Sequence, residues 1–384
     1  MATEWKKVKL QEICESISDG DHLPPPKAEN GIPFVTISNI KDNQLDFTDT
    51  MFVPETYYEK LDNKRKAKTG DILYSVVGSF GIPVLLKRDE KFVFQRHIAI
   101  LRPNKIDSSF LYYTMLGRDF YAKADAAAIG AAQRTVSLTS LRNIEICLPP
   151  LETQQKIAGI LSAYDDLIEN NRKQIKLLEE AAQKLYKEWF VKLNFPGHEN
   201  VKIVDGMPEG WKKESIDKIY NIRYGKNLPT TEIQSNGKYP VYGANGIIGY
   251  YNISNCNQKV VLITSRGNGS GDVLCTKQKE SFVTNNSFIV LPNQTYDYLQ
   301  FSFIFGQMKS LDFRSIRTGS AQPQLTNNSI SMLNILYPNK ELIIDYCNIA
   351  ERYYEKIDLL DKKIQLLQSA RDKLLPKLMN GELL

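Results

Sequence analysis

The chain has 384 residues, of which 42% are hydrophobic and 24% are charged, as is usual for a globular protein of two or three domains. It has no run of about 18 apolar residues and begins with the polar segment Met1–Lys7, so we expect neither a membrane span nor a signal peptide. The formal net charge of +5 permits nucleic-acid binding, and five widely separated cysteines favour a reducing cytoplasm over a zinc or disulfide framework.

The first part of the chain, residues 5–130, has the pattern of a strand-rich domain. Short runs of β-branched and aromatic residues alternate with turn residues. The predicted strands cover 32–37, 71–77, 82–86, 92–94 and 98–101. The glycines of Gly78–Gly81 predict a hairpin, and a helix is expected near 110–123. We interpret this part as an α+β domain with a twisted, mostly antiparallel sheet.

A long helix is predicted from Glu152 to Phe190, just after Pro149 and Pro150. Apolar residues recur at spacings that alternate between four and three, which is typical of a left-handed coiled coil. The predicted seam positions are Ile157, Leu161, Tyr164, Ile168, Asn171, Ile175, Leu178, Ala182, Leu185 and Trp189. About 39 residues at a rise of 1.5 Å predict a helix roughly 58 Å long.

A turn-rich linker leads to a second strand-rich half and a second long helix after Pro338. Strands are predicted at 239–242, 260–264, 272–275, 282–283 and 287–291, with a glycine hairpin at Gly267–Gly271 and a helix near 296–311. The second seam comprises Tyr346, Ala350, Tyr353, Ile357, Leu360, Ile364, Leu367, Arg371, Leu374 and Leu378.

The two halves are diverged copies of one module. The segment that begins at Gly130-Ala131-Ala132-Gln133 aligns without a gap to the one that begins at Gly319-Ser320-Ala321-Gln322. We call the constant difference in residue number between them the repeat offset. Trp5-Lys6-Lys7 likewise matches Trp211-Lys212-Lys213. The shared register favours an antiparallel pair of helices with a domain at each end, related by a pseudo-twofold axis. Two unrelated surface helices, or a homodimer zipper, are the alternatives.

The seam contains one asparagine. Asn171 is either a buried polar residue that helps to set the helix register or an exposed side chain.

Motifs for catalysis are missing from the chain. Gly267-x-Gly269-x-Gly271 is followed by a predicted strand, so a hairpin turn is favoured over nucleotide binding. No P-loop motif occurs, and the three histidines have no metal-ligand spacing. Leu23-Pro24-Pro25-Pro26 lacks the acidic or amide residue and the aromatic that an adenine methyltransferase would place around its prolines. The chain is therefore expected to recognise rather than to react.

Polar and basic residues gather at the predicted hairpins and loops. Arg and Lys suit phosphates and guanine edges, whereas Asn and Gln suit adenine edges. The candidate DNA-binding residues are His22, Lys64, Arg65, Lys66, Lys68, Ser79, Arg96, Arg134, Tyr224, Lys226, Tyr242, Arg266, Asn268, Ser270, Asn285, Arg317 and Gln322. Any one of them could be a solvated loop residue, but as a set on duplicated halves they indicate DNA.

The whole chain resembles the specificity subunit of a type I restriction-modification system. The matching segments are Trp5-Lys6-Lys7-Val8-Lys9-Leu10, Gly70-Asp71-Ile72-Leu73, Leu148-Pro149-Pro150-Leu151-Glu152-x-Gln154-Gln155, Glu188-Trp189-Phe190-Val191, Phe195-Pro196-Gly197-His198-Glu199, Pro208-Glu209-Gly210-Trp211 and Met379-Asn380-Gly381-Glu382-Leu383. The second copy departs from the pattern, because Pro338-Asn339-Lys340-Glu341 is not followed by the Gln-Gln pair.

The resemblance implies two target-recognition domains, 1–150 and 211–338, which each read one half of a bipartite site in double-stranded DNA. It implies spacer helices over 151–192 and 339–384, the latter with a C-terminal tail, joined by a linker over 193–210. It also implies a cytoplasmic chain without catalytic residues, metal or cofactor. That chain would recruit two modification subunits, which use S-adenosylmethionine, and restriction subunits, which use ATP and Mg.

Two alternatives belong to other classes of protein. One is a stand-alone nuclease that uses Glu55, Glu59 and Lys60. The other is a coiled-coil adaptor without a role on DNA.

Overall fold

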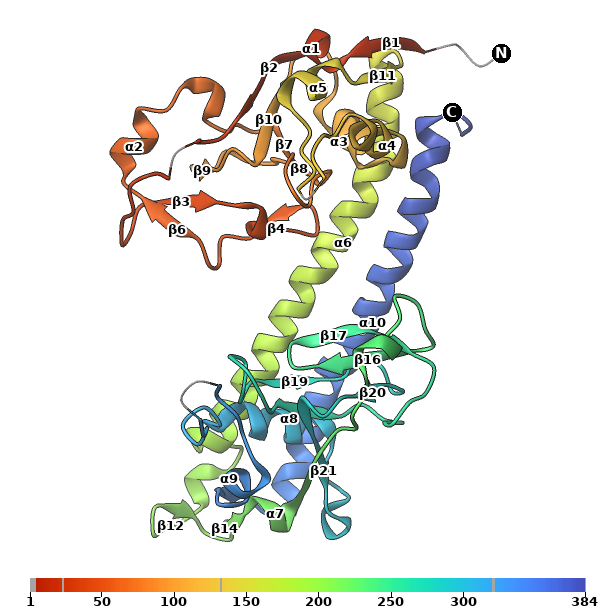
Figure 1. The fold of residues 1–384 in the computed structure, drawn as a ribbon. Helices are drawn as coiled ribbons and strands as arrows, with labels where there is room; N and C mark the ends of the chain where they lie inside the picture. The colour runs from red at the N-terminus through yellow and green to blue at the C-terminus, as the bar shows by residue number, and fades with distance from the viewer. Residues whose placement is uncertain (1–4, 23, 132, 320–321, 384) are drawn as a thin grey trace. The chain divides into compact units, whose positions relative to one another are not determined.

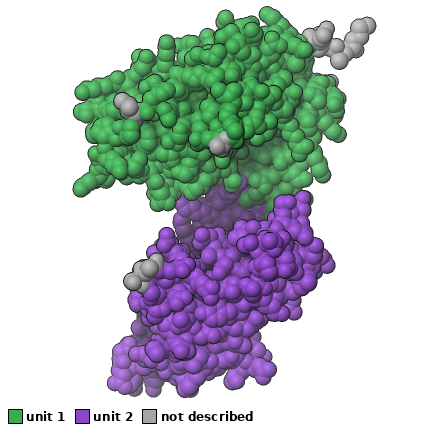
Figure 2. All heavy atoms as spheres, in the orientation of Figure 1, with its two compact units in different colours: residues 1–169, 364–384 green, residues 170–363 purple. Residues whose placement is uncertain are grey.

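The computed structural model describes residues 5–22, 24–131, 133–319 and 322–383. The first four residues, Leu23, Leu384 and three residues of the shared motif (Ala132, Ser320 and Ala321) lie outside the described residues. The chain divides into two compact units, which Figure 2 distinguishes by colour. Unit 1 comprises residues 1–169 and 364–384, and unit 2 comprises residues 170–363. Each unit therefore combines one sheet-rich half with parts of both long helices.

The sheet-rich half of unit 1 is built from short strands and helices that precede the first long helix (Figure 1). Its strands are β1 (Lys6–Lys9), β2 (Cys14–Asp19), β3 (Ile32–Val35), β4 (Ile40–Lys41), β5 (Gln44–Leu45), β6 (Met51–Val53), β7 (Ile72–Ser75), β8 (Pro83–Leu85), β9 (Val93–Phe94), β10 (Ile98–Pro103) and β11 (Glu145–Leu148). Its helices are α1 (Leu10–Ile13), η1 (Ile37–Asn39), α2 (Glu55–Glu59), η2 (Asn63–Arg65), α3 (Ser108–Leu116), α4 (Arg118–Ala126) and α5 (Leu138–Asn143).

Two sheets carry the first half. The larger has the order β2-β10-β7-β8, with antiparallel neighbours throughout. The smaller has the order β6-β3-β9, in which β3 pairs with β9 in parallel. Ile72 and Tyr74 of the central strand β7 are fully buried in the same core as Phe110 of helix α3, which is also fully buried. The sheet of the first half therefore rests on a core that it shares with the adjoining helices.

Unit 2 repeats this arrangement. Its strands are β12 (Ile203–Val204), β13 (Met207–Pro208), β14 (Lys212–Ser215), β15 (Tyr220–Tyr224), β16 (Tyr239–Gly243), β17 (Gly246–Tyr251), β18 (Val261–Thr264), β19 (Val273–Cys275), β20 (Phe282–Val283), β21 (Ser287–Pro292) and β22 (Asn334–Tyr337). Its shorter helices are η4 (His198–Asn200), α7 (Ile216–Ile219), η5 (Thr230–Glu232), η6 (Gln294–Tyr296), α8 (Phe301–Ser310) and α9 (Asn327–Ser331).

The sheet topology of unit 2 matches that of unit 1. Its larger sheet has the order β15-β21-β18-β19, and its smaller sheet β17-β16-β20 again contains one parallel pair. The equivalent strands β7 and β18 begin at Ile72 and Val261, which are separated by the same repeat offset as Gly130 and Gly319. The α+β fold and the predicted strands of both halves are confirmed.

One helix prediction was inaccurate. The segment expected to be a single helix near 110–123 forms two helices, α3 and α4, which are separated at Gly117. Gly117 has an extended backbone, with φ −70° and ψ 148°, so it ends one helix and begins the next. A glycine at this point favours a break because its backbone is the most costly to hold in a helix.

The two long helices pack against each other. Helix α6 (Leu151–Tyr186) continues into a π-helical turn, η3 (Lys187–Val191), and helix α10 spans Lys340–Met379. In unit 1, Ile157 near the start of α6 shares a core with Leu378 near the end of α10. In unit 2, Tyr186 at the end of α6 lies 5.8 Å, between ring centroids, from Tyr346 near the start of α10. The helices are therefore antiparallel, as predicted.

The predicted seam is buried at most of its positions. Asn171 is only 2% exposed, which confirms the buried alternative, and its side-chain Nδ2 finds no partner among the described residues. Such a group costs roughly 1–3 kcal/mol of desolvation. Near its end α6 also buries Tyr186, and η3 buries Phe190, because there the helix contacts the domain core as well as the other helix.

The loss of the Gln-Gln pair from the second copy has a structural counterpart. At the start of α6, buried Gln154 donates from Nε2 to the carbonyl of Pro149 at 2.8 Å and accepts from the backbone N–H of Asp107 at 2.9 Å. The equivalent of Gln154 in α10 is Ile343, which is fully buried in the core of unit 2. An apolar contact therefore replaces a hydrogen-bonded one.

Candidate nucleic-acid interface

The glycine loop that follows β7 in unit 1 and the one that follows β18 in unit 2 are held in the same way. Backbone hydrogen bonds tie it to the segment that follows the shared glycine motif. They run from Gly78 N to Arg134 O (3.0 Å) and Val136 N to Val76 O (2.9 Å) in unit 1, and from Gly267 N to Pro323 O (3.1 Å) and Leu325 N to Ser265 O (2.8 Å) in unit 2. All of the paired groups are related by the repeat offset. The duplication therefore extends upstream to the hairpin loops.

In each unit a glycine lies where two backbone segments approach closely, and we call this contact the glycine crossing. A Cβ atom at Gly20 would overlap the carbonyl oxygen of Phe94, and one at Gly225 would overlap that of Val283. Only glycine allows such close approach of two backbones. These two glycines were missed in the sequence, although each follows a strand at the same place in its half. We call the assembly of the crossing, the hairpin loop and the segment after the glycine motif the cradle.

The cradle brings sequence-predicted residues to equivalent positions. The pairs of positions, unit 1 first, are Asp19 and Tyr224, Asp21 and Lys226, Val77 and Arg266, Arg96 and Asn285, and Gln133 and Gln322. One backbone framework therefore presents different side chains in the two units. Arg96 of unit 1 and Tyr224, Lys226, Arg266, Asn285 and Gln322 of unit 2 were all predicted site residues.

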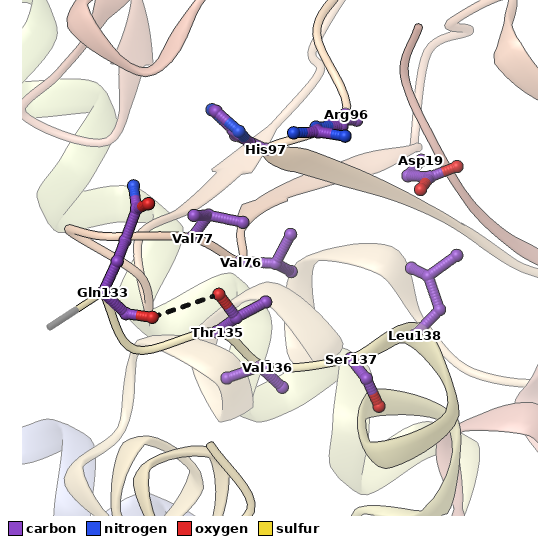
Figure 3. A pocket seen from close by; sticks show the side chains of 10 residues that line it. All are labelled: Asp19, Val76, Val77, Arg96, His97, Gln133, Thr135, Val136, Ser137 and Leu138. Carbon is purple, nitrogen blue, oxygen red and sulfur yellow. Dashed lines mark hydrogen bonds between the residues drawn. The ribbon is translucent and has the colours of Figure 1, made fainter. Parts of the chain in front are cut away.

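In unit 1 the cradle encloses a pocket of about 290 Å³. Figure 3 shows Arg96 and His97 on one side, with Gln133 at the rim and Asp19 at another edge. The floor is apolar and includes Val76 and Val136. Arg96 is exposed, and its side chain makes no hydrogen bond or ion pair with the described residues. The pocket thus combines hydrogen-bond donors with an apolar surface.

In unit 2 an aromatic ring occupies the equivalent place. Tyr224 lies 4.2 Å, between ring centroids, from Phe288, and its hydroxyl donates to the carbonyl of Leu325 at 3.3 Å. Exposed Arg266 and Lys226 flank this ring on the cradle, and neither side chain pairs with an acidic group among the described residues. The unit 2 cradle therefore presents unneutralised positive charge.

An ionic cluster borders the unit 1 cradle. Asp19 lies 2.9 Å from His22, and Arg65 lies 3.3 Å from Asp21. The hydroxyl of Tyr57 also donates to Asp21 at 2.9 Å, and burial together with this bond raises the pKa of Tyr57. Arg65 is thus held by internal carboxylates, which reduces the charge that it can offer to a phosphate.

The remaining basic residues near this cluster fall into two groups. Lys64 and Lys68 are exposed, whereas Lys66 donates to the carbonyl of Glu59 at 2.8 Å and lies over the ring of Tyr58. Ser18 Oγ donates to the carbonyl of Lys64 at 2.9 Å, which holds this run beside strand β2. Lys64 and Lys68 are therefore better placed for phosphate contact than Lys66.

The other predicted residues lie on the loops around the cradles. Ser79 and Asn268 are exposed in the two glycine loops. Arg134 is paired with Asp125 and lies over the ring of Phe80. Arg317 donates from Nε to the carbonyl of Arg314 at 3.0 Å.

Two predicted site residues are buried, and this corrects their assignment. Tyr242 is 3% exposed, its hydroxyl bonds to Gln278 and to the backbone N–H of Lys277, and burial raises its pKa to about 12. Ser270 is fully buried and donates to the carbonyl of Ser265 at 3.2 Å. Both side chains support the loops from inside, so neither is placed to reach a ligand.

The described residues form neither a metal site nor a membrane-spanning helix. Within the described ranges, no cluster of three or more His, Cys, Asp or Glu residues is positioned to hold a metal ion. No helix in the same ranges is both long and apolar enough to cross a membrane. Glu55, considered above for a nuclease, is ion-paired with Lys91 at 3.2 Å.

Comparison with known proteins gives one consistent result. The family model described as type I restriction modification DNA specificity domain matches residues 2–180 and 208–374, one match for each half. The chain is 26% identical to the type I restriction enzyme MjaIX specificity subunit of Methanocaldococcus jannaschii, with 74% of this chain and 71% of that protein covered. It is 22% identical to the HindI specificity subunit of Haemophilus influenzae, with 99% and 100% covered.

A solved structure supports the fold. The crystal structure of a type I restriction-modification S subunit from M. genitalium superposes with a TM-score of 0.58 at 20% identity, covering 97% of this chain and 96% of that one. The family match favours the specificity subunit over the adaptor and nuclease alternatives. The chain belongs to the type I restriction-modification DNA specificity family, and its role is that of the specificity subunit, itself non-catalytic, in such a complex.

Proposed function

We propose that each unit reads one half of a bipartite site in double-stranded DNA through its cradle. The observation that carries this proposal is the equivalence of the two cradles, which share backbone hydrogen bonds at the repeat offset and differ in side chains. A common framework with divergent side chains is what two readers of different sequences need, because base edges are distinguished by their donor and acceptor patterns.

The proposed DNA contacts fall into two chemical groups, base readers and phosphate contacts. Arg96, Gln133 and Asn285 are the proposed base readers, because guanidinium and amide groups form paired hydrogen bonds with base edges. Lys64, Lys68 and Lys226 are the proposed phosphate contacts, which position the DNA without reading it. Arg266 lies on the cradle where either role is open to it.

The domain boundaries are part of the proposal. Residues 1–150 and 211–338 are the two recognition domains, 151–192 and 339–384 the two spacer helices, and 193–210 the linker. Pro149 and Pro338 stand at these borders, just before α6 and α10.

The partners follow from the family role. The subunit recruits two modification subunits, which supply S-adenosylmethionine-dependent methylation, and restriction subunits, which use ATP and Mg. The complex acts in the cytoplasm, where the DNA that it binds is located. None of these cofactors is assigned to residues of this chain.

Domain replacement tests the proposal. Residues 211–318 are replaced by the equivalent segment of another specificity subunit, and the methylated sites in a host carrying the complex are mapped. One half-site is expected to change while the other stays the same. A change in both half-sites at once would contradict two independent readers.

A further inference from the structure

Unit 2 carries a hairpin of strands β16 and β17 in which β16 is largely buried and β17 exposes apolar side chains. Just after the turn, Ile247 is 44% exposed and Ile248 is 47% exposed, and we call these two residues the apolar tip. Strand β17 lies at the edge of its sheet, which has the order β17-β16-β20. Soluble proteins seldom expose adjacent large apolar side chains without a use for them.

The hairpin is fastened to the cradle. Thr264, at the start of the glycine loop, donates from Oγ1 to the carbonyl of Ala244 at 2.7 Å. Ser287 donates from Oγ to the carbonyl of Gly243 at 3.1 Å. A Cβ atom on Gly269 would lie 3.1 Å from Oδ1 of Asn245, so the hairpin turn and the glycine loop are in contact. The turn that precedes the isoleucines therefore adjoins the glycine loop that carries Arg266 and Asn268.

Within its described residues, unit 1 has no equivalent apolar tip. Strand β3 occupies the place of β16, because Val35 pairs in parallel with Phe94 as Tyr242 pairs with Val283. The chain then turns into η1 and the short β4–β5 hairpin, whose turn from Lys41 to Gln44 is polar. The apolar hairpin thus distinguishes one recognition unit from the other.

The charge around the hairpin indicates its occupant. Lys226 is exposed and is separated from the hairpin by one segment, because Thr284 pairs with Lys226 and donates its N–H to the carbonyl of Tyr242 in β16. Arg266 is exposed on the adjoining loop. The apolar tip adjoins the loop of Arg266, a cation without an acidic partner among the described residues. This combination fits a polyanion that also offers apolar groups, and the DNA groove provides both phosphates and base faces.

We propose that Ile247 and Ile248 make apolar contacts with bases in the half-site read by unit 2. Such contacts use thymine methyl groups or the face of a partly opened base step. The inference rests on the proposed function of the cradle and adds a reader that forms no hydrogen bonds. It predicts that the two half-sites are recognised by different chemistry.

Substitution in the assembled complex tests this contact. The double variant Ile247→Ser and Ile248→Ser is compared with Ile253→Ser, a control that changes a 60% exposed isoleucine just beyond β17. Binding to the cognate duplex and to a random duplex is measured over a range of salt. The double variant should bind the cognate duplex roughly tenfold more weakly, with an unchanged salt slope because no phosphate contact is lost.

Parallel measurements separate the possible failures. Thermal unfolding checks folding, and Ile247→Thr, which keeps a β-branched side chain, serves as a milder variant. Normal cognate binding by the double variant, alongside weakened binding by Arg266→Ala, would overturn the apolar contact and leave the cradle intact. Normal binding by all variants would overturn the cradle itself. Loss of complex assembly with normal DNA binding would make the hairpin a protein contact and end the proposal.

Discussion

Asp165 of helix α6 and Arg371 of helix α10 form an ion pair across the helix seam, with Oδ1 and Nη1 separated by 2.5 Å. Both side chains are largely buried, and the hydroxyl of Tyr113 donates to the second carboxylate oxygen at 2.7 Å. The positions equivalent to Asp165 and Arg371 in the other copy are Tyr354 and Ala182, both buried. The seam is thus charged in unit 1 and uncharged at the matching place in unit 2.

This pair should contribute measurably to stability. Arg371→Ala leaves Asp165 partly buried without its cation, and we expect the free energy of unfolding to fall by about 2–3 kcal/mol. The double variant with Asp165→Ala should cost less than the sum of the two single changes. Urea unfolding of the four proteins measures the coupling, and strict additivity would show that the pair contributes nothing.

Equivalent cradle positions should affect different half-sites. Arg96→Ala is expected to relax base preference in one half-site, and Asn285→Ala in the other, each at a cost of about 1–3 kcal/mol on the preferred sequence. Binding to duplexes with single base-pair changes measures both effects. A matched loss across all sequences would instead assign the residue to a phosphate contact.

The glycine crossing should be intolerant of a side chain. Gly225→Ala places a Cβ atom against the carbonyl oxygen of Val283, so the two backbones must separate and stability should fall by roughly 2 kcal/mol or more. Gly159→Ala is the matched control, because it lies within α6 and a Cβ atom there meets nothing within 4 Å. The control should stabilise the helix by about 0.5–1 kcal/mol. Equal melting temperatures for both variants would disprove the close approach.

Thiol reactivity should follow burial. Burial raises the pKa of Cys14 to about 12, and burial also raises the pKa of Cys256, Cys275 and Cys347. A higher pKa means less of the nucleophilic thiolate at any given pH. Iodoacetamide at pH 8 should therefore modify exposed Cys147 first, as mass spectrometry of the native protein can measure. Alkylation of Cys347 at the rate of Cys147 would contradict this burial.

The helix pair should set the spacer between half-sites. One heptad inserted after Ile175 lengthens α6 by about 10.5 Å, close to three base pairs of rise, and a matched insertion after Ile364 keeps the seam in register. The double insertion should widen the methylated spacer while both half-sites are kept. A single insertion should lower stability, since it misaligns the seam. A folded double insertion that keeps the original spacer would show that the helices do not measure it.

The amino-acid sequence alone determined the features that repeat locally. The seam from Ile157 to Trp189 could be predicted because apolar residues recur with the period of a helix, and that period survives whatever the tertiary contacts are. The repeat offset likewise identified two copies of one module. Strands such as β7 and β18 could be predicted because short β-branched runs bounded by turn residues are typical of strands.

Only the tertiary structure decided which side chains meet. The exposure of Arg266 and the burial of Tyr242 and Ser270 depend on pairing between segments far apart in the chain, and residue type does not reveal it. The crossing at Gly20 and Gly225 was hidden for the same reason, since its partners Phe94 and Val283 lie several strands further along the chain. The sequence pattern therefore specifies the scaffold, whereas non-local backbone pairing selects which side chains are exposed on the cradles.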